Sequence, residues 1–120
     1  MLVADDDAMT LQVLRTVLDL EEFEVVLAED GQQALELALT QQFDGIVLDQ
    51  MMPGLTGLEV LARLRAEPST RELPIVLLTA AVASSLPHDP VEMGADAHLA
   101  KPFSPLHLIQ VLEDLIEAPR

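Results

Sequence analysis

Three aspartates, a threonine and the only lysine of this 120-residue sequence each follow a short apolar run. They are Asp5, Asp6, Asp49, Thr79 and Lys101. Clustered carboxylates repel each other by about 4 kcal/mol per pair at 4 Å, so a fold tolerates them only where a proton, cation or ligand compensates. Carboxylate oxygens suit Mg²⁺, and an ammonium group suits a phosphoryl oxygen. An aspartate beside Mg²⁺ can itself attack phosphorus, so the set favours phosphoryl transfer to a carboxylate.

The apolar runs that precede these residues are typical of strands buried on both faces of a parallel sheet. They cover residues 1–4, 25–28, 46–48, 75–78 and, more weakly, 97–100. The segments between them have helical periodicity, so strand–helix units repeat along the chain. This order predicts an α/β fold, with helices on both faces of a doubly wound parallel sheet. Ligands of such sheets bind outside the carboxyl ends of the strands, where the candidate residues are expected to meet.

Leucines and alanines mark the buried faces expected for the helices. The first three faces comprise Leu11, Leu14 and Leu18; Ala34, Leu35, Ala38 and Leu39; and Leu58, Leu61 and Leu64. Thr56 and Glu59 have capping-box spacing before the third helix. Ser104 and Pro105 have the preferred cap-then-proline order for a last helix that should end near Glu117.

Prolines interrupt the place where a fourth helix belongs. Pro87 and Pro90 lie between Thr79 and Gly94, and interior prolines disrupt helices. Asp89 and Pro90 suit the start of a new turn that Gly94 ends. We therefore predict a fourth helix shortened to one turn.

Composition limits the classes of protein that remain. The net charge is −15, which argues against direct binding of nucleic acid or of an anionic membrane surface. No apolar run has membrane-spanning length, and no secretory signal pattern is present. There is no cysteine, which excludes disulfides and thiolate sites. We expect a single soluble, cytoplasmic domain over residues 1–120, without membrane insertion.

Four segments together resemble the CheY-like receiver domains of response regulators in two-component signalling, over essentially the whole chain. They are LVADDD at 2–7, LDQMMPGLTG at 48–57, LTA at 78–80 and GADAHLAKPF at 94–103. Any one of them would be weak, but the combination is highly specific. The resemblance implies a flavodoxin-like (βα)₅ fold with five parallel strands in the order 2-1-3-4-5.

The resemblance implies a phosphoacceptor and a metal site. Asp49 would accept phosphate from a phosphohistidine of a histidine kinase or histidine phosphotransfer domain. Asp6 would bind Mg²⁺ directly and Asp5 largely through water. Asp49 and the backbone carbonyl of Met51 would complete the protein ligands. Asp7 has no family role, and we interpret it as a helix-start carboxylate.

The resemblance also implies how the phosphoryl group would be sensed. Lys101 would contact it, and Thr79 would move toward it as the switch residue. Ala80, being small, would leave the site open to the donor. Met51 and Ala81 are apolar and offer no group to position a hydrolytic water. We expect slow self-dephosphorylation in a phosphoacceptor that is not an enzyme.

Two features depart from the family pattern. His98 stands where the family often has Tyr or Phe, and the chain has no Tyr or Trp. It could rotate inward after Thr79 moves and titrate near neutral pH, or be an edge-strand histidine with no switching role. The shortened fourth helix makes the family's usual dimer through that face unexpected. We predict a monomer, or association through another face.

Three alternative functions compete with this one. A haloacid-dehalogenase-like phosphatase normally presents a second acid two residues after the nucleophile, where this chain has Met51. A flavodoxin-like binding module would need a phosphate-cradling loop and a flavin-stacking Trp or Tyr. A receiver-like interaction module of a hybrid kinase or multidomain regulator, with phosphorylation secondary, remains open.

Overall fold

The five predicted strands form one parallel sheet with helices on both sides. The structure is a computed structural model that describes residues 1–79, 94–101 and 103–117. The strands are β1 (Leu2–Ala4), β2 (Val26–Ala28), β3 (Ile46–Asp49), β4 (Ile75–Thr79) and β5 (Ala97–Ala100), in the order β2-β1-β3-β4-β5. The described helices are α1 (Ala8–Leu20), α2 (Gly31–Thr40), α3 (Gly57–Ala66) and α4 (Pro105–Glu117). The expected fold class and strand order are confirmed.

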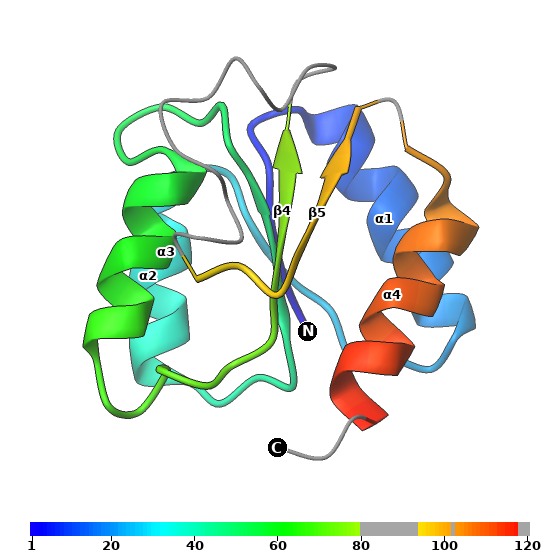
Figure 1. Ribbon diagram of the computed structural model, residues 1–120. Coiled ribbons are helices and arrows are strands. Elements are labelled where there is room, and N and C mark those ends of the chain that lie inside the picture. The colour runs from blue at the N-terminus through cyan, green and yellow to red at the C-terminus, as the bar shows by residue number, and fades with distance from the viewer. Residues whose placement is uncertain (80–93, 102, 118–120) are drawn as a thin grey trace.

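Side chains alternate along each strand and therefore point to both faces of the sheet, and helices bury both faces. Leu2, Ile46 and Leu77 belong to the hydrophobic cluster shared with α2 and α3. Val3 and Val47 belong to the cluster shared with α1 and α4 on the opposite face. Figure 1 shows this sandwich, with α2 and α3 on the left of the sheet and α1 and α4 on the right. Two buried faces explain why the strands read as continuous apolar runs.

Side chains cap the helices where the sequence predicted. The Asp7 carboxylate accepts hydrogen bonds from the Met9 backbone N–H at 3.2 Å and the Thr10 hydroxyl at 2.7 Å. Thr56 and Glu59 form a reciprocal capping box at the start of α3, with two hydrogen bonds of 3.2 Å. The interpretation of Asp7 as a helix-start carboxylate is therefore confirmed.

The last helix also follows its prediction, and α2 departs from it at one position. Helix α4 runs from Pro105 to Glu117, and the Ser104 hydroxyl oxygen accepts a 3.4 Å hydrogen bond from the His107 N–H. Leu39 was predicted on the buried face of α2, but it is 43% exposed. That prediction is wrong because the buried face of α2 is formed by Gly31, Ala34, Leu35 and Ala38, whereas Leu39 lines a surface pocket. The predicted shortened fourth helix falls on residues 80–93, outside the described residues.

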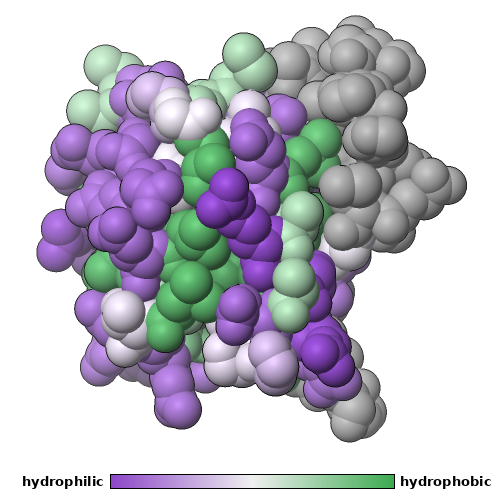
Figure 2. Space-filling view, turned by 90° about the vertical axis from the view of Figure 1, so that its left-hand side faces the viewer, coloured by the Kyte–Doolittle hydropathy of each residue, from purple (hydrophilic) through white to green (hydrophobic). Residues whose placement is uncertain are grey.

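The outer face of α2 and α3 is mainly hydrophilic. A space-filling view of this side shows polar surface around a strip of hydrophobic surface (Figure 2). Within the described ranges, no helix is both long and apolar enough to cross a membrane. Among the described residues, Asp5 and Asp49 are the acidic residues that are buried.

Candidate functional site

Strand pairing brings Asp5 and Asp49 together at the carboxyl edge of the sheet. Strands β1 and β3 are paired with Ala4 opposite Leu48, so the residues that follow them are neighbours. Asp6 joins them, and one carboxylate oxygen from each of the three lies within 4.8 Å of the others. Asp5 is fully buried and Asp49 is 4% exposed, while Asp6 is exposed. The predicted meeting of these aspartates is what the structure shows.

Lys101 reaches the same cluster from the end of β5. Its backbone N–H donates to the Thr79 carbonyl at 2.8 Å, which fixes the residue beside the end of β4. Its ammonium nitrogen lies 2.8 Å from Asp5 Oδ2 and 3.3 Å from Asp49 Oδ1. The side chain is 31% exposed. The lysine thus neutralises part of the buried negative charge and still reaches solvent.

Burial and charge shift the pKa values of this cluster. Burial and, next, the nearby charge of Asp5 raise the pKa of Asp49 to about 6, although Lys101 opposes both. Burial of Lys101 disfavours its charged form, but the hydrogen bond to Asp5 and the two carboxylate charges outweigh this and raise its pKa. The lysine is therefore held charged, and Asp49 holds its proton to a higher pH than an ordinary aspartate. A second cation would relieve this cost.

Thr79 lies at the end of β4, one residue beyond the partner of Asp49. The register places Asp49 opposite Leu78. Thr79 is fully buried, and its hydroxyl donates to the Leu99 carbonyl at 3.4 Å. This distance is long for an O–H···O hydrogen bond, which normally measures about 2.7 Å. The hydroxyl is thus weakly held beside the acidic cluster.

The structure also adds a residue that sequence reasoning missed. Gln50 is only 7% exposed, and its side-chain oxygen accepts a 2.8 Å hydrogen bond from the Leu58 N–H at the start of α3. The sequence pattern could have indicated this role, because side chains alternate along a strand and the residue two positions after Leu48 lies on the same side of the sheet, facing α3. A polar side chain there must find a partner inside the protein.

The remaining predicted positions are placed as follows. Met51, whose carbonyl was expected near the metal, follows Gln50 and has an exposed side chain. His98 lies in β5 opposite Leu77 and is partly buried, at an edge of the described sheet. Its switching role stays a prediction. Ala80 lies outside the described residues.

The donor set suits Mg²⁺. Ligands of an octahedral Mg²⁺ lie about 2.9 to 4.1 Å apart, since each sits about 2.05 Å from the ion. The three carboxylate oxygens within 4.8 Å of one another need only a small adjustment to meet that spacing. Exposed Asp6 leaves one side open to water, and Mg²⁺ normally keeps several waters. The residues present therefore fit this ion.

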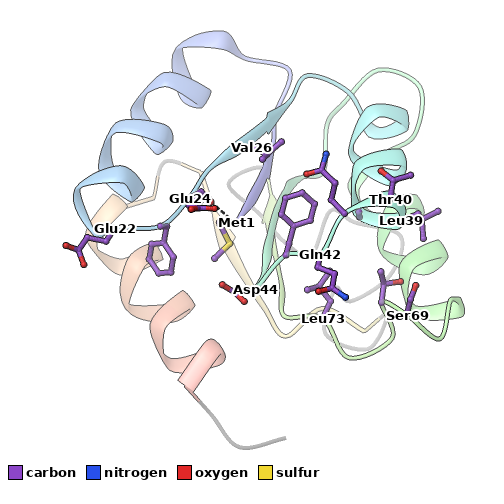
Figure 3. A pocket seen from close by; sticks show the side chains of 15 residues that line it. Met1, Glu22, Glu24, Val26, Leu39, Thr40, Gln42, Asp44, Ser69 and Leu73 are labelled. Carbon is purple, nitrogen blue, oxygen red and sulfur yellow. Dashed lines mark hydrogen bonds between the residues drawn. The ribbon is translucent and has the colours of Figure 1, made fainter.

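A hollow among the described residues lies away from the acidic cluster. A pocket of about 1000 Å³ opens at the opposite edge of the sheet, where the strands begin (Figure 3). Met1 lies in its middle, and its ammonium group donates to the Glu24 carbonyl at 2.7 Å. None of the described site residues lines this pocket. The volume of this pocket therefore does not locate the candidate site, which is identified by the carboxylates and the lysine of the acidic cluster.

The family of response regulator receiver domains matches residues 1–113. The chain belongs to this family. This receiver domain is 40% identical over 115 residues to the response regulator MprA of Mycolicibacterium vanbaalenii, covering 96% of the chain and 49% of that protein. It is 34% identical to the phosphate regulon transcriptional regulatory protein PhoB of Pseudomonas aeruginosa, covering 96% of the chain and 50% of that protein. The chain thus spans about half the length of these curated relatives.

Solved structures show the same fold. The receiver domain of Francisella response regulator 1452 matches with a TM-score of 0.89 and 34% identity, covering 97% of this chain and 94% of that one. The receiver domain of the sensor histidine kinase PA1611 from Pseudomonas aeruginosa was solved with a magnesium ion in its active site cleft. It matches with a TM-score of 0.85 and 29% identity, covering 98% of this chain and 96% of that one. Receiver domains of both response regulators and kinases therefore resemble this chain.

Proposed function

We propose that this receiver domain takes a phosphoryl group from a phosphohistidine donor onto Asp49, with Mg²⁺, and changes conformation through Thr79 and Lys101. The observation that carries the proposal is the convergence of three carboxylates with the only lysine of the chain, which contacts both Asp5 and Asp49. We also infer that residues 1–120 form one receiver domain, which the match over residues 1–113 supports.

Charge balance supports the metal. Asp5, Asp6 and Asp49 carry three negative charges against one positive charge on Lys101, which leaves −2. One Mg²⁺ would neutralise the cluster, held by Asp6 and Asp49, by Asp5 largely through water, and by the Met51 carbonyl. When bound, the ion stabilises negative charge on the transferring phosphoryl oxygens. The magnesium site of the PA1611 receiver domain is consistent with this assignment.

The transfer itself needs a nucleophile and a leaving group. A carboxylate oxygen of Asp49 attacks phosphorus as the bond to the imidazole nitrogen of the donor breaks, and the electron pair returns to that nitrogen. The ammonium group of Lys101, now 3.3 Å from Asp49 Oδ1, offers positive charge to the phosphoryl oxygens. Phosphorylation then adds about one negative charge at Asp49, since a dianionic phosphoryl group replaces a carboxylate.

The weak hydrogen bond of Thr79 supports a switching role. Its hydroxyl can leave the Leu99 carbonyl at small cost, because the 3.4 Å bond is near the limit of hydrogen bonding. A phosphoryl oxygen on Asp49 would be the stronger acceptor. Because Leu99 lies in β5, loss of this bond changes the contact between β4 and β5. Phosphorylation would thereby shift an existing equilibrium of that edge.

A groove beside the site supports docking of a protein donor. A largely apolar groove of about 500 Å³ lies between the start of α1 and the start of α4. Met9, Val13 and Phe103 line it, and Lys101 forms the end nearest the acidic cluster. A histidine kinase or histidine phosphotransfer domain that packs on this groove would hold its phosphohistidine next to Asp49.

Labelling by acetyl phosphate tests the proposal. Wild-type protein should be phosphorylated in MgCl₂ and not in EDTA, as read by intact-mass spectrometry, and Asp49→Asn should not be labelled. Asp6→Asn, which removes the charge of a proposed metal ligand, should strongly raise the MgCl₂ concentration needed for labelling. Its matched control is Asp7→Asn, which removes a charge from the same run but keeps a residue that caps helices equally well. Absence of labelling in folded wild-type protein would overturn the proposal and favour the interaction-module alternative.

A further inference from the structure

Every backbone N–H in the first turn of α3 has a partner. The first four N–H groups of a helix have no partner within the helix. The Glu59 N–H donates to the Thr56 hydroxyl at 3.2 Å, and the N–H of Thr56, the N-cap residue, donates to the Glu59 carboxylate at 3.2 Å. The other two go to Gln50. Thus a residue in the strand end next to Asp49 supplies half of the cap of α3.

Gln50 joins three parts of the fold through its backbone and side chain. Its N–H donates to the Leu78 carbonyl of β4 at 2.8 Å. Its carbonyl accepts from the Gly57 N–H at 3.1 Å, and its side-chain oxygen accepts from the Leu58 N–H at 2.8 Å. An apolar side chain of the same length would leave the Leu58 N–H without this acceptor in a buried setting, which is costly.

The start of α3 lies directly against the backbone of the phosphoacceptor strand. A Cβ atom at Gly57 would come within 2.6 Å of the Asp49 carbonyl oxygen and 3.0 Å of the Gln50 Cα. Only glycine permits so close an approach. Residues 51–56 therefore form a short closed loop, anchored by Gln50 at one end and by the first turn of α3 at the other.

We propose that Gln50 is a positioning residue that fixes the 51–56 loop through its hydrogen bond to Leu58, and thereby sets the affinity of the Asp5–Asp6–Asp49 cluster for Mg²⁺. This inference rests on the proposed function, because the loop carries the Met51 carbonyl that is expected to contact the ion. Loss of the hydrogen bond to Leu58 removes one anchor of the loop. The Met51 carbonyl must then be ordered when Mg²⁺ binds, and this ordering lowers the affinity for Mg²⁺. Partners that orient metal ligands typically change metal affinity by about 10- to 100-fold.

The test compares two buried hydrogen bonds at opposite ends of α3. Gln50→Met keeps the length of the side chain and removes the acceptor. The matched control is Thr70→Val, because Thr70 is 4% exposed and its hydroxyl donates to the Leu64 carbonyl at 2.6 Å, far from the acidic cluster. Gln50→Glu keeps acceptor oxygens at the N-terminus of α3, where negative charge is favourable. Affinity for Mg²⁺ is read from amide NMR shifts during titration with MgCl₂, and hydrogen exchange reports on the Leu58 amide.

Gln50→Met should raise the Mg²⁺ dissociation constant by about tenfold and speed exchange of the Leu58 amide. Thr70→Val should change that constant less than twofold. Gln50→Glu, which keeps the acceptor, should bind Mg²⁺ at least as tightly as wild-type protein. If Gln50→Met does not fold, Gln50→Asn replaces it, since its amide is one methylene too short to reach Leu58. Wild-type affinity in either variant, or equal weakening by Thr70→Val, would overturn the inference alone. Failure of wild-type protein to bind Mg²⁺ would instead overturn the proposed function and the inference with it.

Discussion

The buried carboxylate of Asp49 should destabilise the metal-free protein at neutral pH, and Asp49→Asn should remove that cost. An ordinary aspartate titrates at 3.8 and Asp49 at about 6. Each tenfold change in proton affinity corresponds to about 1.4 kcal/mol, so ionised Asp49 lowers the free energy of unfolding by about 3 kcal/mol. The side chain is 5% exposed, so solvent screens this effect little. Asparagine resembles the protonated acid in shape and charge and avoids the cost.

The dependence on pH has a definite sign. Between pH 3.8 and about 6 the folded protein retains a proton on Asp49 that the unfolded chain has released. This contribution therefore lowers the stability of wild-type protein as pH rises through that window, and the loss is complete above it. The advantage of Asp49→Asn should be about 3 kcal/mol at pH 7.5 and about 1 kcal/mol at pH 4.5. At pH 7.5 this corresponds to a rise in Tm of about 10 °C.

Urea unfolding in EDTA at the two pH values measures the effect. Glu72→Gln is the control, because it removes one negative charge from an exposed turn. It should change stability by less than about 0.5 kcal/mol at both pH values. Addition of Mg²⁺ at ten times its dissociation constant should stabilise wild-type protein by about 1.4 kcal/mol. The difference in free energy of unfolding between Asp49→Asn and wild type should therefore become smaller. The reasoning fails if Asp49→Asn is no more stable than wild type at pH 7.5, or if the gap does not shrink at pH 4.5.

Two further predictions concern the docking groove and the end of α1. Because Met9 lines the groove, Met9→Gln should slow phosphorylation by a phosphohistidine protein severalfold without changing labelling by acetyl phosphate. Leu20 is equally exposed on the same helix, and Leu20→Gln should affect neither rate. Equal slowing by both variants would contradict the docking role. Glu22 has a φ of 66°, a conformation that costs non-glycine residues about 1 kcal/mol, so Glu22→Gly should raise the free energy of unfolding by about that amount in urea titrations. A loss of stability on this substitution would show that the Glu22 side chain makes a compensating contact.

Much of the local structure was readable from the sequence because its causes lie within a few residues of each other. The capping box of Thr56 and Glu59 and the cap at Asp7 are properties of one helical turn, and both form. Apolar runs of three or four residues indicated strands buried on both faces, and the resemblance added the order in which they pair. With that order, the carboxyl ends of β1, β3, β4 and β5 share one edge, which placed Asp5, Asp49, Thr79 and Lys101 together.

Tertiary structure decided how those side chains meet, because the atoms involved come from residues far apart in the chain. Lys101 lies 96 residues from Asp5, and only the packed register of β4 and β5 brings its ammonium group between Asp5 and Asp49. The raised pKa of Asp49 follows from burial, which no sequence pattern measures. The role proposed for Gln50 likewise depends on where α3 returns to the sheet, and the exposure of Leu39 depends on which residues of α2 pack into the core. Residue types and spacing therefore determined the chemistry available to this protein, and packing determined which atoms are placed to take part in it.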